Sequence, residues 1–446
     1  MTGASEQLAA FAVALDPARV EPSLVQKAKD HFLDTIGVAC TGIGEPQTRA
    51  VTAVVRRWGG TAEAGVVGLD LRLPAPKAAF LNALHARIHT FDDAHEAGPS
   101  HPSAAVVAGA LSAAEAAYAP GRALLAALLA GYEAATRLSA ALGPGHYGAG
   151  FHSTGTCSPI GAVVAASRAR GFDAPRIVAA IGLAGEAAVG IRQYQIDGSM
   201  LDSALNGARG AELGVAAAEM AAGGVSGPRG VLDGRLGLLR VMSGSAVDAL
   251  TADLGRRWEF AATALKPYAS CRFTHGPVAA LRAAKLDHRQ VDAIEIVTFR
   301  ASVDVADRPN PQTRTEAILS HQLAAALALL GRPILPRDLD TIDDSARTLA
   351  ARVRVRHDPE LDSQYPGRWP HRIAVLLRDG SRVTLESVTP PVADSAQARA
   401  KFKALAGPVL GPARADQVVA VVDRLETLPD LASLLQLLRP GLAEAA

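Results

Sequence analysis

The sequence predicts a mainly α protein, with a large all-helical domain into which a smaller α+β domain is inserted. Apolar residues make up 49% of the 446 residues but aromatic residues only 4%, so packing helices through small side chains is the simplest way to bury this chain. Helical periodicity dominates up to about residue 260, strand patterns appear only after it, and helical periodicity returns from about residue 395. We therefore predict a helical domain at 1–261 and 395–446 and an α+β domain at 262–394.

The N-terminal part of the chain reads as a series of buried helices. The first begins near Pro22, because proline is favoured in the first turn, and Ala28, Phe32 and Ile36 then recur at helical spacing. Most of the later helices are apolar on several faces, which indicates that they lie inside a helical core. They are expected at about 76–90, 103–117, 121–141, 156–170, 175–191 and 205–222.

The predicted α+β domain is marked by strand patterns. Residues 291–299 are rich in β-branched side chains, and valines alternate with arginines at 352–356, as in a half-exposed strand. Two further apolar runs, 374–377 and 383–385, flank the turn residues 378–381 and predict a hairpin. Helical stretches are expected near 274–286 and 315–331.

Composition excludes several classes of function. The 45 basic and 44 acidic residues give a net charge of +1, so no basic excess exists to neutralise nucleic-acid phosphates or to bind an anionic membrane. No apolar run is long enough to span a bilayer. The three cysteines lie far apart without CxxC spacing, which argues against a disulfide framework or a structural zinc site. Together with an N-terminus unlike a signal peptide, this predicts a cytoplasmic protein.

The strongest polar cluster lies at 85–103. It holds four of the twelve histidines and the adjacent acids Asp92 and Asp93. A histidine such as His101, oriented by a nearby carboxylate, can move a proton near neutral pH. The alternative is a solvated loop with helix-capping acids. The i, i+4 pair His85 and His89 also raises metal-dependent hydrolysis as another alternative, although the HExxH pattern is absent.

Two further clusters carry polar side chains. Residues 145–155 combine glycines, which let backbone approach a ligand, with the donors Tyr147, His152 and Ser153; an ordinary glycine-rich helix junction is the alternative. The GxGxxG match in this stretch is weak because a helix precedes it.

The third cluster, 266–275, begins with Lys266 and Tyr268 and ends with Arg272 and His275. Its basic side chains suit the binding of carboxylates. Cys271 is a candidate nucleophile by residue type, but a structural role is favoured.

These three clusters, in this order, resemble the MmgE/PrpD family, which includes 2-methylcitrate dehydratase, cis-aconitate decarboxylase and iminodisuccinate epimerase. The resemblance covers about residues 5–430 and rests on 32–37, 82–85, 91–93, 101–103, 150–152, 198–200, 227–228, 266–268 and 274–275. It implies a helical domain with an inserted α+β lid domain, a homodimer, and an active site in the cleft between the domains. It also implies a small carboxylate substrate and no metal or organic cofactor.

The family's site residues carry over unevenly. Its three histidines fall on His101, His152 and His275. The acid that usually precedes Phe-Asp-Asp is Thr90 here, the usual lysine after the Gly-Ser-Met segment is Asp202, and a histidine shortly after it is Leu205. The loss of a cation at Asp202 suggests a substrate with fewer carboxylates than 2-methylcitrate or cis-aconitate, or one that carries a hydroxyl or amine near Asp202. As catalytic residues we predict His101, His152, Asp93 and His275, and as substrate-binding residues Asp92, Tyr147, Ser153, Asp202, Lys266, Tyr268 and Arg272.

The leading functional hypothesis is a cofactor-independent lyase, a dehydratase that abstracts the proton α to a carboxylate of a small hydroxy acid. An isomerase or epimerase, or a decarboxylase, would share its enolate-like intermediate. A non-catalytic carboxylate-binding protein is the alternative from a different class.

Overall fold

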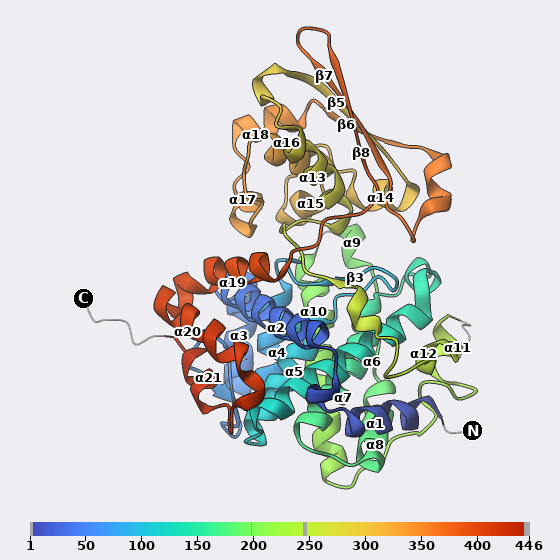
Figure 1. The fold of residues 1–446 in the computed structure, drawn as a ribbon, viewed down its shortest axis with the longest axis vertical. Coiled ribbons are helices and arrows are strands. Elements are labelled where there is room, and N and C mark those ends of the chain that lie inside the picture. Colours follow the sequence, from blue (N-terminus) through green and yellow to red (C-terminus); the bar gives the residue numbers. More distant parts are fainter. Residues whose placement is uncertain (1–2, 198, 244–247, 441–446) are drawn as a thin grey trace.

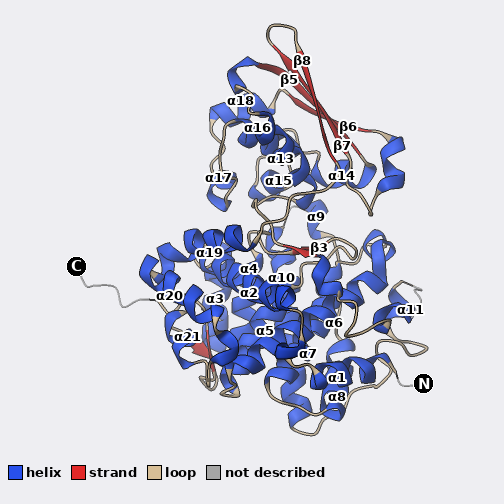
Figure 2. Ribbon diagram, in the orientation of Figure 1, coloured by secondary structure: helices blue, strands red, loops and turns tan. Residues whose placement is uncertain are grey.

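The computed structural model describes residues 3–197, 199–243 and 248–440. In Figure 1 most of the chain forms a broad helical body, and a smaller unit with a sheet stands on one side of it. Figure 2 shows that helix dominates and that the longer strands are confined to the smaller unit. The predicted mainly α fold class is confirmed.

The helical body contains helices from both ends of the chain, because α19 returns from the smaller unit and packs against α2. Its helices are α1 (Ala4–Ala14), α2 (Pro22–Gly42), α3 (Pro46–Trp58), α4 (Ala75–Arg87), α5 (Ser103–Ala116), α6 (Gly121–Gly148), α7 (Ser153–Ala169), α8 (Ala174–Gly185), α9 (Tyr194–Asp197), α10 (Met200–Ala222), α11 (Leu238–Met242), α12 (Asp248–Thr251), α19 (Ser395–Leu410), α20 (Pro412–Asp423) and α21 (Ala432–Leu437). Its strands are the short pairs β1 (Ala64–Gly65) with β2 (Arg72–Leu73) and β3 (Ala94–His95) with β4 (Thr263–Ala264).

Small residues allow the central helices to approach closely. A Cβ atom added to Gly161 of α7 would lie 2.6 Å from the Cβ of Ala135 and 2.7 Å from the carbonyl oxygen of Gly131, both on α6. A larger side chain at this crossing would force α6 and α7 apart. The alanine-rich composition is therefore the condition for this packing, and it explains why the helices are buried on several faces.

The helices differ from the sequence prediction at a few places. The helices α1 and α3 had not been predicted. The expected helix end near residue 141 agrees with the structure, because Gly143 (φ 64°, ψ −172°) has non-helical backbone angles and Pro144 follows it. The range of α6 therefore covers two helical segments that meet at a kink, and the second segment ends at Gly148.

The smaller α+β unit, residues 275–387, is built on a four-stranded sheet of order β6-β5-β7-β8. Strand β5 pairs in parallel with β6 and antiparallel with β7, which forms the predicted hairpin with β8. Buried residues of α13 and α16 share one apolar cluster with β5, β6 and β7. The strands are β5 (Val291–Thr298), β6 (Val353–His357), β7 (His371–Leu377) and β8 (Arg382–Ser387), and the helices are α13 (His275–Ala284), α14 (Arg300–Ala306), α15 (Arg314–Ile318), α16 (His321–Leu329), α17 (Pro336–Asp340) and α18 (Asp344–Ala350).

Two chain segments connect the helical body to the α+β unit, at 265–274 and 388–394. Nζ of Lys401, on α19, donates to the carbonyl oxygens of Phe91 (2.7 Å) and Lys266 (3.0 Å), and so ties the outgoing segment to the body. An ion pair of 2.7 Å between Arg314 and Glu45 crosses between the two parts. In the part of the chain that the structure describes, no helix is both long and apolar enough to cross a membrane.

Candidate active site

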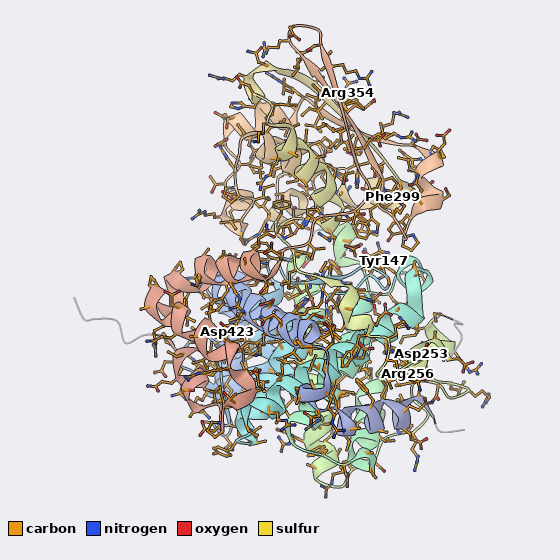
Figure 3. The ribbon with its side chains drawn as sticks, in the orientation of Figure 1. Tyr147, Asp253, Arg256, Phe299, Arg354 and Asp423 are labelled. Carbon is orange, nitrogen blue, oxygen red and sulfur yellow. The ribbon has the colours of Figure 1, made fainter. Side chains whose placement is uncertain are left out.

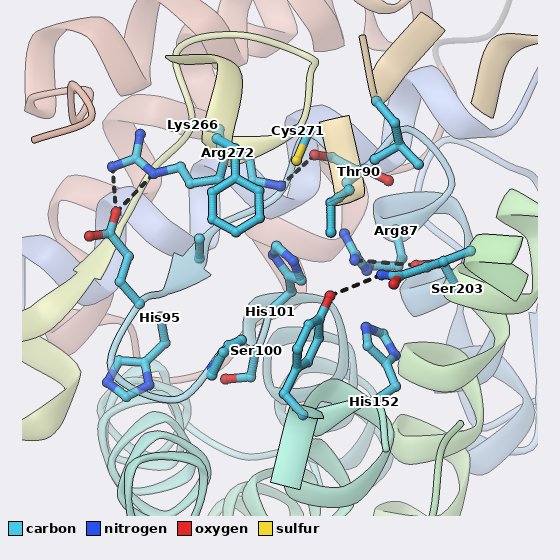
Figure 4. Close-up of a pocket in the computed structure, with 18 of the residues that line it drawn as sticks. Arg87, Thr90, His95, Ser100, His101, His152, Ser203, Lys266, Cys271 and Arg272 are labelled. Atoms are coloured by element: carbon cyan, nitrogen blue, oxygen red, sulfur yellow. Dashed lines mark hydrogen bonds and ion pairs between the residues drawn. The ribbon is translucent and has the colours of Figure 1, made fainter. Parts of the chain in front are cut away.

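A cavity of about 110 Å³ lies where the helical body meets the α+β unit, and it brings together residues from all three predicted clusters. Figure 4 shows Lys266, Cys271 and Arg272 on one side of it, His152 on the other and His101 between them. Figure 3 places Tyr147 on the body and Phe299 on the α+β unit, on either side of this junction. The lining residues are Arg87, Thr90, Ala94, His95, Glu96, Pro99, Ser100, His101, Tyr147, His152, Tyr194, Gln195, Ser203, Lys266, Cys271, Arg272, Phe273, Val305, Thr315, Leu319, Tyr365 and Trp369.

His101 is held in one orientation just before α5. Its Nδ1 lies 2.5 Å from the carbonyl oxygen of Asp93, which can only accept, so Nδ1 carries the proton. Its backbone N–H donates to Oγ1 of Thr154 at 3.0 Å. Burial lowers the pKa of His101 well below its usual value, and the nearby Arg87 and Lys266 lower it further. The imidazole is therefore neutral, and no described group occupies its Nε2 lone pair.

Asp93 positions this loop and does not line the cavity. Its carboxylate accepts from the backbone N–H of Ser103 at 3.1 Å, at the start of α5, and lies 3.2 Å from Nδ1 of His31. Both contacts fix the Asp93 backbone, whose carbonyl oxygen orients His101. The predicted catalytic role of Asp93 is therefore indirect in this geometry.

His152 precedes α7 and faces the same cavity in the opposite tautomer. Nδ2 of Asn206, which can only donate, lies 2.9 Å from Nδ1 of His152. Nδ1 must then accept, and the ring proton sits on Nε2. The ring also packs edge-on against Tyr194, with centroids 5.3 Å apart. Burial lowers the pKa of His152 well below its usual value, with Arg87 and Arg192 adding to the effect.

Lys266 is fully buried at the cavity, and its Nζ donates to the carbonyl oxygen of Thr90 at 2.7 Å. Burial lowers the pKa of Lys266 to about 7, although the carboxylate of Asp92 opposes the shift. The side chain can therefore bind an anion as an ammonium group near neutral pH. A bound carboxylate would raise this pKa again, because an opposite charge favours the protonated form.

Arg87 supplies a second cation. Its guanidinium donates to Oδ1 of Asp92 at 2.6 Å and to Oγ of Ser203 at 3.3 Å, and its Nε has no partner among the described residues. Burial raises the pKa of Asp92, while Arg87 and Lys266 oppose that shift. Asp92 lies behind the lining and orients Arg87, so the structure does not place it against a ligand.

Arg272 lines the cavity, but its donors are already engaged. Its Nε lies 2.9 Å from Oε1 of Glu96, and other donors reach the carbonyl oxygens of Pro390 and Pro391. It also donates to Nδ1 of His275 at 3.2 Å, and a second guanidinium nitrogen lies 2.8 Å from Oε1 of Glu96. Arg272 therefore joins both connecting segments to the loop that carries Glu96.

His275 and Tyr268 do not line the cavity. Nε2 of His275 donates to the carbonyl oxygen of Ser270 at 3.2 Å, so both ring nitrogens are bound by the segment itself. Burial and the neighbouring Arg272 lower the pKa of His275 well below its usual value. Tyr268 packs edge-on against His275 and beneath the guanidinium of Arg282. Their predicted roles remain proposals that this geometry does not favour.

The glycine-rich stretch contributes Tyr147 as well as His152. The Tyr147 hydroxyl accepts from Nε2 of Gln195 at 3.0 Å, which leaves its proton free to reach a ligand, and Arg192 stacks 3.6 Å from its ring centroid. Ser153 is buried and is not among the lining residues. The side chain of Asp202, on α10, lies outside the described residues.

Several lining residues were not predicted from the sequence. Arg87 stands five residues before Asp92, a helix-to-loop spacing that could have suggested an ion pair, and Thr90 had been noted only as a departure from the family. The aromatic lining residues Phe273, Tyr365 and Trp369 carried no local signal, because only the fold brings them to the cavity. Among residues 3–197, 199–243 and 248–440, no group of three or more His, Cys, Asp or Glu side chains is placed to hold a metal ion.

Comparison with known proteins extends over nearly the whole chain. Residues 6–250 match the MmgE/PrpD N-terminal domain and residues 268–427 the MmgE/PrpD C-terminal domain. The cis-aconitate decarboxylase-like protein oryM of Aspergillus oryzae is 26% identical over 97% of this chain and 96% of its own length. Cis-aconitate decarboxylases of Aspergillus terreus and Mus musculus are 23% and 26% identical, each over 98% of this chain and 96% and 93% of their own lengths.

Proposed function

The chain belongs to the MmgE/PrpD family, and we propose that it is a lyase that acts on a small carboxylate by proton transfer at the carbon next to the carboxylate. The reaction that this site fits best is elimination of water from a hydroxy acid. The substrate would lie in the cavity between the helical body and the α+β unit.

The observation that carries the proposal is the pairing of two neutral histidines in opposite tautomers. His101 presents an unprotonated Nε2, the form that a general base needs. His152 presents Nε2–H, a fixed hydrogen-bond donor that can stabilise the leaving hydroxyl. An elimination of water requires one group of each kind, and both are held in place before a substrate binds.

In this scheme Nε2 of His101 takes the proton from the α-carbon, and the electron pair of that C–H bond forms the new carbon–carbon double bond. The bond to the β-hydroxyl breaks while Nε2–H of His152 donates a hydrogen bond to its oxygen. The proton that His101 has taken passes to that oxygen, so the hydroxyl leaves as water. Lys266 holds the carboxylate beside the α-carbon and stabilises the negative charge that develops there. Loss of that proton returns His101 to its neutral form, and His152 stays neutral throughout.

Decarboxylation is a second candidate, since the curated relatives are named cis-aconitate decarboxylases or resemble one. It would use the same cavity but would need only one proton donor after CO₂ leaves. An isomerase or epimerase would use both histidines and return the proton to the other face of the α-carbon. A binding protein without activity would use Lys266 alone.

One experiment separates these candidates. The protein is incubated in D₂O with a panel of hydroxy-dicarboxylates and unsaturated di- and tricarboxylates, and the reaction is followed by ¹H NMR with parallel measurement of CO₂. A loss of the α-proton signal with formation of an alkene supports the lyase. Release of CO₂ supports the decarboxylase, deuterium exchange without a new product supports the isomerase, and no exchange with any compound overturns the proposal.

A further inference from the structure

The cavity has two chemically different walls. The polar wall consists of Arg87, His101, His152 and Lys266. The apolar wall consists of Phe273, Val305, Leu319, Tyr365 and Trp369. Phe273 precedes the α+β unit, and the other four belong to it. The proposed chemistry uses only the polar wall.

The apolar wall is preformed, because its aromatic rings pack on one another. The ring centroids of Phe273 and Trp369 lie 4.8 Å apart, and that of Tyr365 lies 5.9 Å from Trp369. Nε1 of Trp369 donates to the carbonyl oxygen of Pro366 at 3.1 Å, so the polar atom of this side chain already has a partner. Apart from the hydroxyl of Tyr365, the wall therefore offers the ligand a carbon surface in a fixed arrangement.

The described cations of the cavity do not suit a ligand with many carboxylates. Arg87 is paired with Asp92, and Arg272 with Glu96, which itself lines the cavity. Three described lysine or arginine side chains line the cavity. Each of the two arginines is paired with a carboxylate, whereas Lys266 donates to a backbone carbonyl oxygen. A ligand with three carboxylates would leave anionic groups against Glu96 or against the aromatic rings, at a desolvation cost.

We propose that the substrate is an organic acid with its one or two carboxylates at one end and an alkyl or aryl group of several carbons at the other. The carboxylate end would lie against Lys266 and the two histidines, and the apolar group against the apolar wall. This inference rests on the proposed function, since it concerns the ligand of the same site. It predicts that affinity rises with the size of the apolar group.

The test is a binding series with unreactive dicarboxylates, measured by isothermal titration calorimetry: succinate and its 2-methyl, 2-propyl, 2-butyl and 2-phenyl derivatives, with tricarballylate as the tricarboxylate. We expect the dissociation constant to fall about fourfold for each added methylene. Tricarballylate should bind more weakly than 2-propylsuccinate. A flat series, tightest binding by tricarballylate, or no binding by any compound would overturn the inference.

Two variants test whether the gain in affinity with a larger apolar group comes from the apolar wall. Val305→Thr replaces a methyl group with a hydroxyl at nearly constant volume and should weaken 2-butylsuccinate about fourfold while leaving succinate unchanged. Val303→Thr is the matched control, because Val303 lies on the same helix, is half-buried and does not line the cavity. Leu319→Gln is the second test position. Equal weakening by the control, or none by either wall variant, would contradict the assignment.

These binding measurements do not require catalysis. Failure of this inference can therefore be told apart from failure of the proposed lyase activity. A protein that follows the alkyl series but never exchanges a substrate proton keeps this inference and loses the proposed lyase activity. An active lyase that prefers tricarballylate keeps the activity and loses this inference.

Discussion

Nδ2 of Asn206 donates a hydrogen bond to Nδ1 of His152 at 2.9 Å, whereas Nδ1 of His101 donates to the carbonyl oxygen of Asp93 at 2.5 Å. The two imidazoles that line the cavity are therefore fixed in opposite tautomers by partners of opposite hydrogen-bonding character. The fold thus sets which ring nitrogen of each histidine carries the proton. The first two predictions concern these two histidines.

Replacing Asn206 should disturb His152 without removing a group that touches the substrate. Asn206→Asp offers Nδ1 an acceptor, so we expect the ring proton to move from Nε2 to Nδ1 and kcat to fall roughly 10- to 100-fold with little change in KM. The ¹⁵N chemical shifts of the His152 ring report the tautomer directly. A variant with altered kcat but unchanged ring shifts would show that Asn206 acts by packing alone.

The variant His101→Asn tests the proposed base. We expect it to remain folded, with a thermal midpoint close to that of the wild type, and to lower kcat by roughly 100-fold or more. Solvent deuterium exchange at the α-carbon should be lost in parallel. An active variant would remove His101 from proton transfer. His95→Asn is a useful comparison, because His95 lines the same cavity but lies 3.1 Å from Glu259.

The pH dependence should have an alkaline limit set by Lys266. Its pKa of about 7 means that the ammonium form is lost as the pH rises through that value, so kcat/KM should fall on the alkaline side. A bound carboxylate favours the charged form, so the alkaline limit of kcat should lie at higher pH. The acid limit should lie well below pH 6.5, where His101 gains a proton. Lys266→Met should abolish the limit near 7 together with most of the binding.

Arg272 and Glu96 should behave as a pair. Because the donors of Arg272 already contact protein groups, we expect Arg272→Ala to act by loosening the junction between the helical body and the α+β unit. A double-mutant cycle with Glu96→Gln should give a coupling energy of about 1–3 kcal/mol in the free energy of unfolding. Additive effects, with KM raised only by Arg272→Ala, would instead show that Arg272 binds the substrate.

Activity should survive prolonged treatment with EDTA. The prediction follows from the sequence, where the histidines and acids of 85–103 lack a complete ligand pattern, and from the absence of a three-ligand group among the described residues. The assay compares kcat before and after chelation and dialysis. Loss of activity that zinc or manganese restores would move metal-dependent hydrolysis to first place.

The sequence by itself determined the mainly α fold class, the location of the four strands of the α+β unit and the three polar clusters, because these depend on local periodicity and on residue type. His101, His152, Lys266, Tyr147 and Arg272 were found in this way, and the structure places all five at one cavity. The short strands β1 to β4 were not predicted.

Only the tertiary structure decided what each side chain does there. His275 and Arg272 are three residues apart and were predicted as a catalytic and a substrate-binding residue. Hydrogen bonds within their own segment nevertheless turn His275 away from the cavity. Asn206 has its role because it contacts His152, which lies far away in the sequence. Trp369 has its role because the junction of the two parts of the fold brings it to the cavity. Tautomers and cavity walls depend on such long-range contacts, and no local pattern in the chain encodes them.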